Sequence, residues 1–265
     1  MNMLIVTSQL ALLKSSKRWL VLVLGITPFA TTAVATPQTF ISPSHQVGLL
    51  ELYSSQGCSS CPPAERWISR FIDEPKLWQE IIPINFRVNY WDYLGWKDPY
   101  SSAKFSERQR LYRALGYSRN VATPGFIVNG EGWNGWFYQR PLELVNNNYA
   151  GQITATFDDQ IKVSYQHKDQ DGKLVTVNTA ILGFGLEDYV SKGENEGHTF
   201  VQDFVVLDHQ QQNLKVTASD KGKEDVLSFP KVDVSHYQPK RTALVVWISE
   251  VNRPNPLQAV GGWLE

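Results

Sequence analysis

The sequence has few cysteines, two among 265 residues, and it has no excess of basic residues. Two cysteines are too few for a disulfide-stapled scaffold, so packing must hold the fold together. Lys and Arg number 25 against 26 Asp and Glu, so the chain lacks the positive charge of a nucleic-acid-binding surface, and we expect no nucleic-acid partner. It also lacks a paired-histidine metalloprotease motif and a glycine-rich phosphate loop of the Walker type.

Hydrophobic and aromatic residues, in contrast, are abundant. They include 9 Trp, 11 Tyr and 12 Phe, and hydrophobic residues make up 42% of the chain. This composition excludes a solvated disordered chain and provides ample material for a core. The length fits one or two domains.

Residues 1–35 have the three-part layout of a secretory signal peptide. They contain no acidic residue, and an apolar run over residues 19–26 is too short to span a bilayer as a helix. Small residues suited to cleavage follow at 33–35. The alternative is an uncleaved membrane anchor. Three basic residues precede the apolar run, namely Lys14, Lys17 and Arg18.

Cleavage after this segment leaves 230 residues and changes the net charge from −1 to −4. We therefore expect a periplasmic or secreted protein with no membrane span after signal removal. Its two cysteines, Cys58 and Cys61, would then function in an oxidising compartment.

The first half of the mature chain alternates strand and helix patterns. Strands are predicted at 47–53, 81–88 and 126–128, and a helix with one apolar face at 102–115, ended by Gly116. A helical pattern also follows the Cys pair. Asn129-Gly130 predicts a tight hairpin turn. A second short strand is expected at 133–138, and Pro141 is expected to open a helix that reaches about Ala150.

The second half contains short alternating segments separated by turns, which is typical of a small antiparallel β-sandwich. We therefore place domain limits at 44–150 and 151–265. The strands expected in the second half cover 153–157, 161–167, 173–184, 199–207, 213–217 and 242–251.

The strongest chemical signal is the pair Cys58 and Cys61, separated by two serines. At the start of a helix, partial positive charge and free N–H groups favour a thiolate on the first cysteine. Cys58 is thus the candidate nucleophile. Cys61 would resolve a mixed disulfide and release the partner.

Other interpretations of this pair remain open. It can be a structural disulfide, or a relic in a domain that only binds a partner. Copper or zinc handling would require further ligands, and the chain has no other cysteine. The histidines are scattered in sequence, at His45, His167, His198, His209 and His236.

Three sequence blocks resemble an uncharacterised bacterial family of secreted thioredoxin-like proteins, known as a domain of unknown function. The first block is Ser-Gln-Gly-Cys-Ser-Ser-Cys-Pro-Pro-Ala at 55–64, the second covers 90–99, and the third is 122–124. The order of elements is also similar to that of the thioredoxin fold. The resemblance implies an α/β thioredoxin-like domain, followed here by the β-sandwich, and a thiol–disulfide role.

The resemblance also implies a cis peptide bond between Thr123 and Pro124, facing the Cys pair and shaping the edge where an extended substrate binds. The alternative is an ordinary trans turn. The chain departs from ordinary thioredoxins at Pro62 and Pro63, which follow the Cys pair; Pro62 cannot donate the N–H of the first helical turn. Gly125 replaces the residue that usually follows Thr-Pro in the secreted family.

Three further residues are candidates for the site. Glu51 lies in a predicted strand seven residues before Cys58, where thioredoxins place a buried acid as a proton relay; otherwise it faces solvent on an edge strand. The long aromatic loop after the second strand contains Trp91, which is expected to line a substrate groove, and Asp92, which is expected to act on a thiol proton. Alternatively, these aromatics only plug a seam between domains.

The sequence thus predicts an exported thiol–disulfide oxidoreductase that needs no bound cofactor. Its partners would be protein thiols or disulfides. The rival hypotheses are a non-catalytic binding module with a structural disulfide and a copper- or zinc-handling protein. Two shielded sulfurs would favour the binding module, and a histidine beside both sulfurs would favour metal handling.

Overall fold

The computed structural model describes residues 36–144, 146–216 and 225–265, and the predicted signal peptide lies outside the described residues. The described chain has two α-helices, α1 (Pro62–Ser69) and α2 (Ala103–Ala114). Its first eight strands are β1 (Gln38–Ile41), β2 (His45–Gln46), β3 (Gly48–Ser54), β4 (Ile81–Arg87), β5 (Gly125–Val128), β6 (Glu131–Gly132), β7 (Asn146–Tyr149) and β8 (Gln152–Phe157). The others are β9 (Gln160–Gln166), β10 (Leu174–Phe184), β11 (Leu186–Tyr189), β12 (Thr199–Gln202), β13 (Val205–Lys215), β14 (Val226–Pro230), β15 (Arg241–Glu250) and β16 (Pro256–Leu264).

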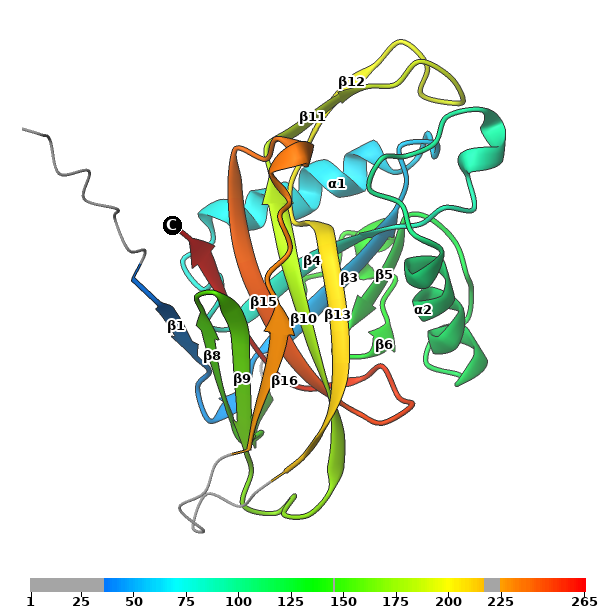
Figure 1. The fold of residues 1–265 in the computed structure, drawn as a ribbon. Helices are drawn as coiled ribbons and strands as arrows, with labels where there is room; N and C mark the ends of the chain where they lie inside the picture. The colour runs from blue at the N-terminus through cyan, green and yellow to red at the C-terminus, as the bar shows by residue number, and fades with distance from the viewer. Residues whose placement is uncertain (1–35, 145, 217–224) are drawn as a thin grey trace, which may run out of the picture. The chain divides into compact units, whose positions relative to one another are not determined.

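One eight-stranded sheet unites strands from both halves of the chain, in the order β16-β15-β10-β13-β4-β3-β5-β6 (Figure 1). Strands β3 and β4 are parallel, and β5 joins β3 in antiparallel orientation. The junction is the parallel pairing of Val205 in β13 with Asn85 in β4. A smaller sheet has the order β1-β8-β9-β14.

The predicted fold class, an α/β thioredoxin-like domain followed by a small antiparallel β-sandwich, is therefore wrong. The described chain is mostly β, and the strands assigned to two separate folds form one large sheet. The physical reason is the β13–β4 pairing, which joins residues 120 positions apart. Hydrophobic periodicity reports which face of a strand is buried, and it carries no information about which distant strand lies beside it.

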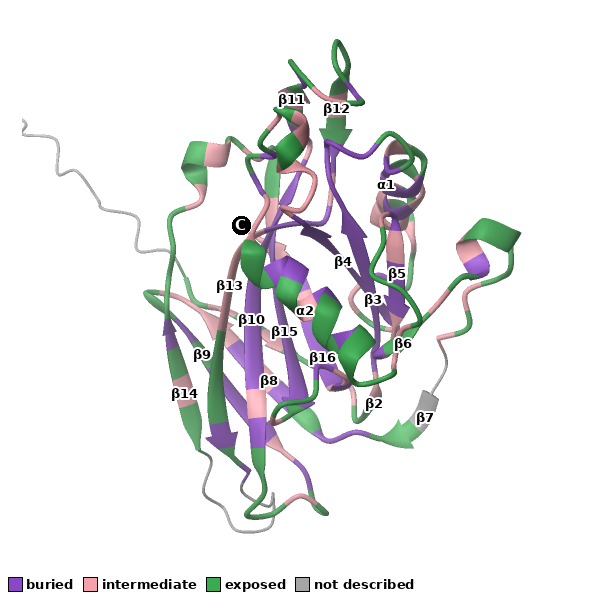
Figure 2. Ribbon diagram, turned by 90° about the vertical axis from the view of Figure 1, so that its right-hand side faces the viewer, coloured by how far each residue is buried: buried purple, intermediate pink, exposed green. Residues whose placement is uncertain are grey.

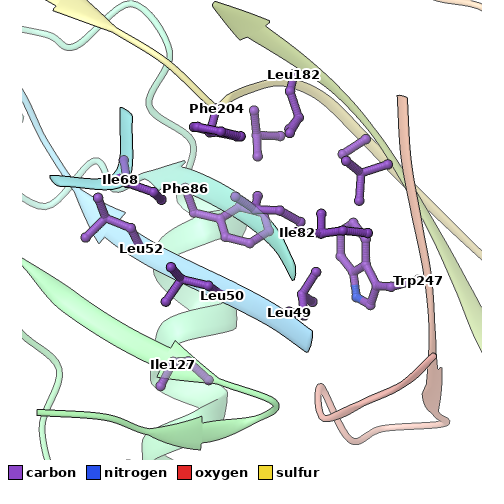
Figure 3. Close-up of a cluster of buried hydrophobic side chains, with 14 of the residues drawn as sticks. Leu49, Leu50, Leu52, Ile68, Ile82, Phe86, Ile127, Leu182, Phe204 and Trp247 are labelled. Atoms are coloured by element: carbon purple, nitrogen blue, oxygen red, sulfur yellow. The ribbon is translucent and has the colours of Figure 1, made fainter. Parts of the chain in front are cut away.

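The main core fills the space between this sheet and the two helices. Side chains from β3 and β4 meet Ile68 of α1, Leu182 of β10 and Trp247 of β15 in a single cluster (Figure 3). Strand β3 is buried at all seven positions. Figure 2 shows that β3 and β4 are buried, whereas α2 has both buried and exposed residues, as expected for a helix with one covered face.

Helix α2 matches its predicted limits, because both ends have local stop signals. Ser102 is the N-cap, and its hydroxyl accepts a hydrogen bond from the backbone N–H of Lys104 at 3.3 Å. Gly116 follows the helix with a φ of 82°, a left-handed conformation that suits glycine. The Asn129-Gly130 turn between β5 and β6 is also confirmed, with φ of 49° and 88°.

Two element predictions between β5 and β8 are wrong. Residues 133–138 do not form a strand; a short 3-10 helix covers Gly135–Tyr138. No helix starts at Pro141, and strand β7 lies at Asn146–Tyr149 instead. Packing explains the first error, because the rings of Trp133 and Trp136 both contact Phe126 of β5 at 5.8 and 5.5 Å between centroids. Sequence propensity alone favoured a strand here, but these ring contacts require a different backbone path.

Candidate functional site

The Cys pair lies in the short connection between β3 and α1. The backbone N–H of Cys58 donates to the Ser55 carbonyl at 3.1 Å, and that of Cys61 donates to the Cys58 carbonyl at 3.2 Å. Helix α1 begins only at Pro62, so Cys61 is its N-cap and Cys58 lies in the preceding turn. The expectation that Cys58 lies at the start of the helix is therefore wrong by about one turn. Two prolines at the first helical positions fix the start, since proline suits the first turn and lacks an N–H.

Both sulfurs are shielded from solvent, with Cys58 1% exposed and Cys61 fully buried. The Cys58 Sγ lies 3.3 Å from the Ser60 hydroxyl and 3.6 Å from the Thr123 carbonyl oxygen. Two shielded sulfurs are the arrangement that the binding-module hypothesis expects. The two thiols nevertheless differ in their surroundings.

The two thiols, Cys58 and Cys61, differ in pKa. Hydrogen bonding from the Cys61 thiol lowers the pKa of Cys58 to about 6, against the opposing effect of burial, and Ser60 adds a smaller lowering contribution. Burial raises the pKa of Cys61 well above its ordinary value, and the negative charges of Cys58 and Glu65 raise it further. At neutral pH the pair is therefore a thiolate at Cys58 beside a thiol at Cys61.

Thr123 and Pro124 join the Cys pair at this site. The peptide bond between them is cis, as predicted. The Thr123 carbonyl faces the Cys58 sulfur, and the Thr123 hydroxyl accepts a hydrogen bond from the Trp91 indole N–H at 2.7 Å. Trp91 stacks on Tyr93, whose side chain is 77% exposed. The predicted residues Cys58, Thr123 and Trp91 are thus neighbours.

The carboxylates of the two predicted acidic residues, Asp92 and Glu51, accept hydrogen bonds from groups other than the cysteines. The Asp92 carboxylate accepts a hydrogen bond from the Ser101 hydroxyl at 3.4 Å, and burial raises its pKa. Glu51 is fully buried, which rules out the solvent-facing alternative. Its carboxylate receives two hydrogen bonds from Arg108, at 2.7 and 2.9 Å, and one each from the hydroxyls of Tyr53 and Tyr112. None of these contacts includes a cysteine.

The acid beside Cys61 is Glu65, which sequence reasoning missed. It lies four residues after Cys61 on α1, and this spacing places both on one helix face. Glu65 is 5% exposed and pairs with the guanidinium of Arg87, which is fully buried. Arg87 also donates to Asp98 at 2.9 Å and to the Ser54 hydroxyl at 2.8 Å. The i+4 spacing was the available signal for Glu65, whereas Arg87 and Asp98 come from separate segments.

A loop from the second half of the chain covers the Cys58 turn. The Asn195 side-chain amide donates to the carbonyls of Gln56 and Cys58, at 2.8 and 2.9 Å. The neighbouring Glu194 carboxylate accepts a hydrogen bond from the Ser59 backbone N–H at 2.9 Å. This cover, Glu194 and Asn195, was also missed, because nothing local links residues 137 positions apart.

Metal ligands do not gather at this site. Across the residues that the structure describes, no group of three or more His, Cys, Asp or Glu side chains is arranged to hold a metal ion. In the same part of the chain, no helix is both long and apolar enough to cross a membrane.

Comparison with known proteins gives a family and similar folds. No curated protein matches the chain. A crystal structure of a protein from Agrobacterium tumefaciens is 21% identical, with a TM-score of 0.53, and the match covers 83% of this chain and 94% of that one. The structure described as HBP35 of Porphyromonas gingivalis is 11% identical, with a TM-score of 0.54, covering 84% of this chain and 76% of that one.

At these identities the likeness concerns the fold alone. The sequence comparison reaches further, because the model of a family described as "Protein of unknown function (DUF1223)" matches residues 49–249. This match includes the Cys pair, the Thr123-Pro124 bond and the covering loop. The chain therefore belongs to the DUF1223 family of proteins of unknown function.

Proposed function

We propose that this protein is an exported thiol–disulfide oxidoreductase that exchanges electrons with protein thiols or disulfides through Cys58 and Cys61. The observation that carries the proposal is the placement of the two thiols within hydrogen-bond contact, with the Cys58 sulfur also facing the Ser60 hydroxyl and the Thr123 carbonyl oxygen. The unequal pKa values of the two thiols agree with it. A pKa of about 6 at Cys58 makes it a thiolate at neutral pH, and the raised pKa of Cys61 keeps its proton in place. The thiolate is the form that attacks a disulfide.

The reaction balances within the pair and its substrate. The Cys58 thiolate attacks one sulfur of a substrate disulfide, which breaks that S–S bond, forms a mixed disulfide and releases the first substrate sulfur as a thiolate. The Cys61 sulfur then attacks Cys58, and its proton passes to a departing substrate sulfur. The products are a Cys58–Cys61 disulfide and a reduced substrate with one thiol and one thiolate, and the thiolate takes its proton from water. The reverse sequence oxidises a substrate dithiol.

Export is part of the same proposal. Its support is the signal-peptide layout of residues 1–35, which would place the Cys pair in a compartment where disulfides form and persist. The partner-facing surface would include Trp91 and the Thr123 backbone, which lie beside Cys58.

The reduction potential of the pair tests the function. A low pKa at Cys58 stabilises the reduced thiolate form and thereby raises the potential at neutral pH. We expect purified protein, equilibrated with glutathione buffers, to show one two-electron transition above about −300 mV. The reduced fraction is measured by acid quenching and iodoacetamide mass labelling. A pair that stays oxidised down to lower potentials is structural and contradicts the proposal.

The cover over Cys58 gives a second prediction. Asn195→Ala removes two hydrogen bonds that hold the covering loop, each contributing about 0.5–1.5 kcal/mol, so local opening becomes easier. We expect iodoacetamide to modify Cys58 about fivefold faster or more at pH 7. Glu196→Ala is the matched control, since Glu196 is an exposed residue of the same loop. Equal labelling rates for both variants would show that Asn195 does not limit access.

One observation favours a second candidate function. Both sulfurs are shielded, as expected for a binding module whose Cys pair forms a structural disulfide. The reduction potential separates the two functions, because a structural disulfide resists reduction by glutathione. Copper or zinc handling has less support, since the described residues place no histidine or third thiol beside the pair.

A further inference from the structure

The covering loop, residues 190–198, joins the two strands of the β11–β12 hairpin. This hairpin is a separate two-stranded sheet that belongs to neither of the larger sheets, and it lies beside α1 (Figure 1). The backbone N–H of Val190 donates to the His198 carbonyl at 2.9 Å, which closes the loop at its base. Gly193 and Gly197 bracket the tip, each with a φ of 84°, a conformation that suits glycine.

The tip of the covering loop binds the main chain on both sides of Cys58. The Glu194 carboxylate accepts a hydrogen bond from the Ser59 N–H. The Asn195 amide donates to the carbonyls of Gln56 and Cys58. An oxygen acceptor beside an N–H donor is also what a polypeptide main chain presents. The loop therefore fills the backbone groups that an extended substrate would bind next to the attacking sulfur.

The base of the hairpin is held by buried groups, unlike the end of its tip. Gln202 of β12 donates to the Glu65 carboxylate at 2.9 Å, and Gln56 donates to Asp188 of β11 at 3.0 Å. Gln202 and Gln56 are buried, whereas Glu194 is exposed. The tip can therefore separate from the Cys58 turn mainly at the cost of its three hydrogen bonds, while the base stays in place.

We propose that the covering loop is an autoinhibitory contact, which competes with a polypeptide substrate for the backbone of residues 56–59 and is displaced before Cys58 reacts. The proposal rests on the proposed oxidoreductase function, because it concerns access to the same sulfur. With the loop in place Cys58 is 1% exposed, so the structure represents the closed form. Glu194 and Asn195 thus control substrate binding and take no part in the sulfur chemistry.

Competition by the loop predicts a specific kinetic pattern. When the binding-competent form is only partly populated, the apparent dissociation constant rises by the inverse of its fraction, and the reaction of the bound complex is unchanged. Loss of the loop's hydrogen bonds should therefore lower the half-saturating substrate concentration and leave the saturated rate unaltered. A loop that only supports the Cys58 turn would instead change the saturated rate, because the surroundings of the sulfur would change.

The test uses Cys61→Ser protein, in which attack by Cys58 is a single event. The probe is the heptapeptide Ser-Thr-Val-Cys-Val-Thr-Ser, whose cysteine forms a disulfide with thionitrobenzoate. The Cys58 thiolate attacks the peptide sulfur, forms a mixed disulfide and releases one equivalent of the yellow thionitrobenzoate thiolate, which is followed by its absorbance. The disulfide of mercaptoethanol with thionitrobenzoate is the small probe, with the same leaving group and no main chain.

We expect Glu194→Ala/Asn195→Ala to lower the half-saturating peptide concentration at least about tenfold, with a saturated rate within about twofold of the parent. The small probe should react at least about tenfold faster without saturating. Asn195→Asp, which keeps the side-chain size but turns a carboxylate toward two carbonyls, should also lower the half-saturating concentration. Glu196→Ala is the matched control, since Glu196 is an exposed residue of the same loop, and it should keep the parent values.

Three results would overturn the autoinhibitory contact: an unchanged half-saturating concentration, an altered saturated rate, or no saturation of the double variant by the peptide. Thermal melting establishes that each variant is folded. The readout needs only attack by Cys58, so it does not depend on the reduction potential of the pair. A wild-type potential typical of a structural disulfide would refute the oxidoreductase function, whereas the kinetic pattern alone decides the function of the loop.

Discussion

Replacing Cys61 with serine is expected to leave Cys58 covalently joined to its protein partners. The Cys58 thiolate still attacks a substrate disulfide, but no second sulfur is present to resolve the product. Cys58→Ser should instead abolish exchange, because the raised pKa of Cys61 keeps that sulfur a thiol. The measurement is a non-reducing gel and mass spectrometry of partners purified from acid-quenched cells that express each variant.

The two single variants serve as controls for each other, since both retain one thiol. Partners captured by Cys61→Ser and absent from Cys58→Ser identify Cys58 as the attacking sulfur. If Cys61→Ser captures nothing and both variants keep wild-type activity, the pair is structural and the binding-module function should replace the oxidoreductase.

Arg87→Met is expected to destabilise the protein by about 3–5 kcal/mol, because it leaves two buried carboxylates without their cation. Glu65 and Asp98 both depend on this guanidinium, and both are at most 5% exposed. Asp98 also accepts the Gln56 backbone N–H at 2.9 Å, so the turn that contains Cys58 should loosen as well. Urea denaturation, followed by tryptophan fluorescence, measures the free energy of unfolding.

Lys76→Met provides the comparison. Lys76 forms a 2.7 Å ion pair with Glu80, but both side chains are largely exposed, so its loss should change the denaturation midpoint little. Equal midpoints for Arg87→Met and Lys76→Met would show that the buried network contributes little to stability. A large loss confined to Arg87→Met would confirm its structural role.

Local sequence signals predicted several elements of the first half. The apolar run that forms β3, the capped helix α2 and the Asn129-Gly130 turn each depend on residues close in sequence. The Cys pair was also identified in this way, whereas the cis bond at Thr123-Pro124 was expected from the family resemblance. Such features are accessible because turn chemistry, capping and periodicity act over a few residues.

The architecture could not be predicted from the sequence, because it depends on pairing between distant strands. The β13–β4 junction rests on a single register position, Val205 opposite Asn85, and no local pattern marks it. The same holds for the site. The sequence left open whether Glu51 is buried or faces solvent, because its partner Arg108 lies 57 residues away on α2. The sequence alone could not assign Arg87, Asp98 and Asn195 to the site, because only the fold brings their segments together.

The cover of Cys58 also has a consequence for biosynthesis. Asn195, which binds the Cys58 carbonyl, is translated 137 residues after that cysteine. At usual elongation rates of about 5–20 residues per second, this is an interval of about 7 to 27 s. During that time the nascent chain presents both thiols without the loop that later shields them. Oxidation or exchange with other factors is therefore easiest before the polypeptide is complete.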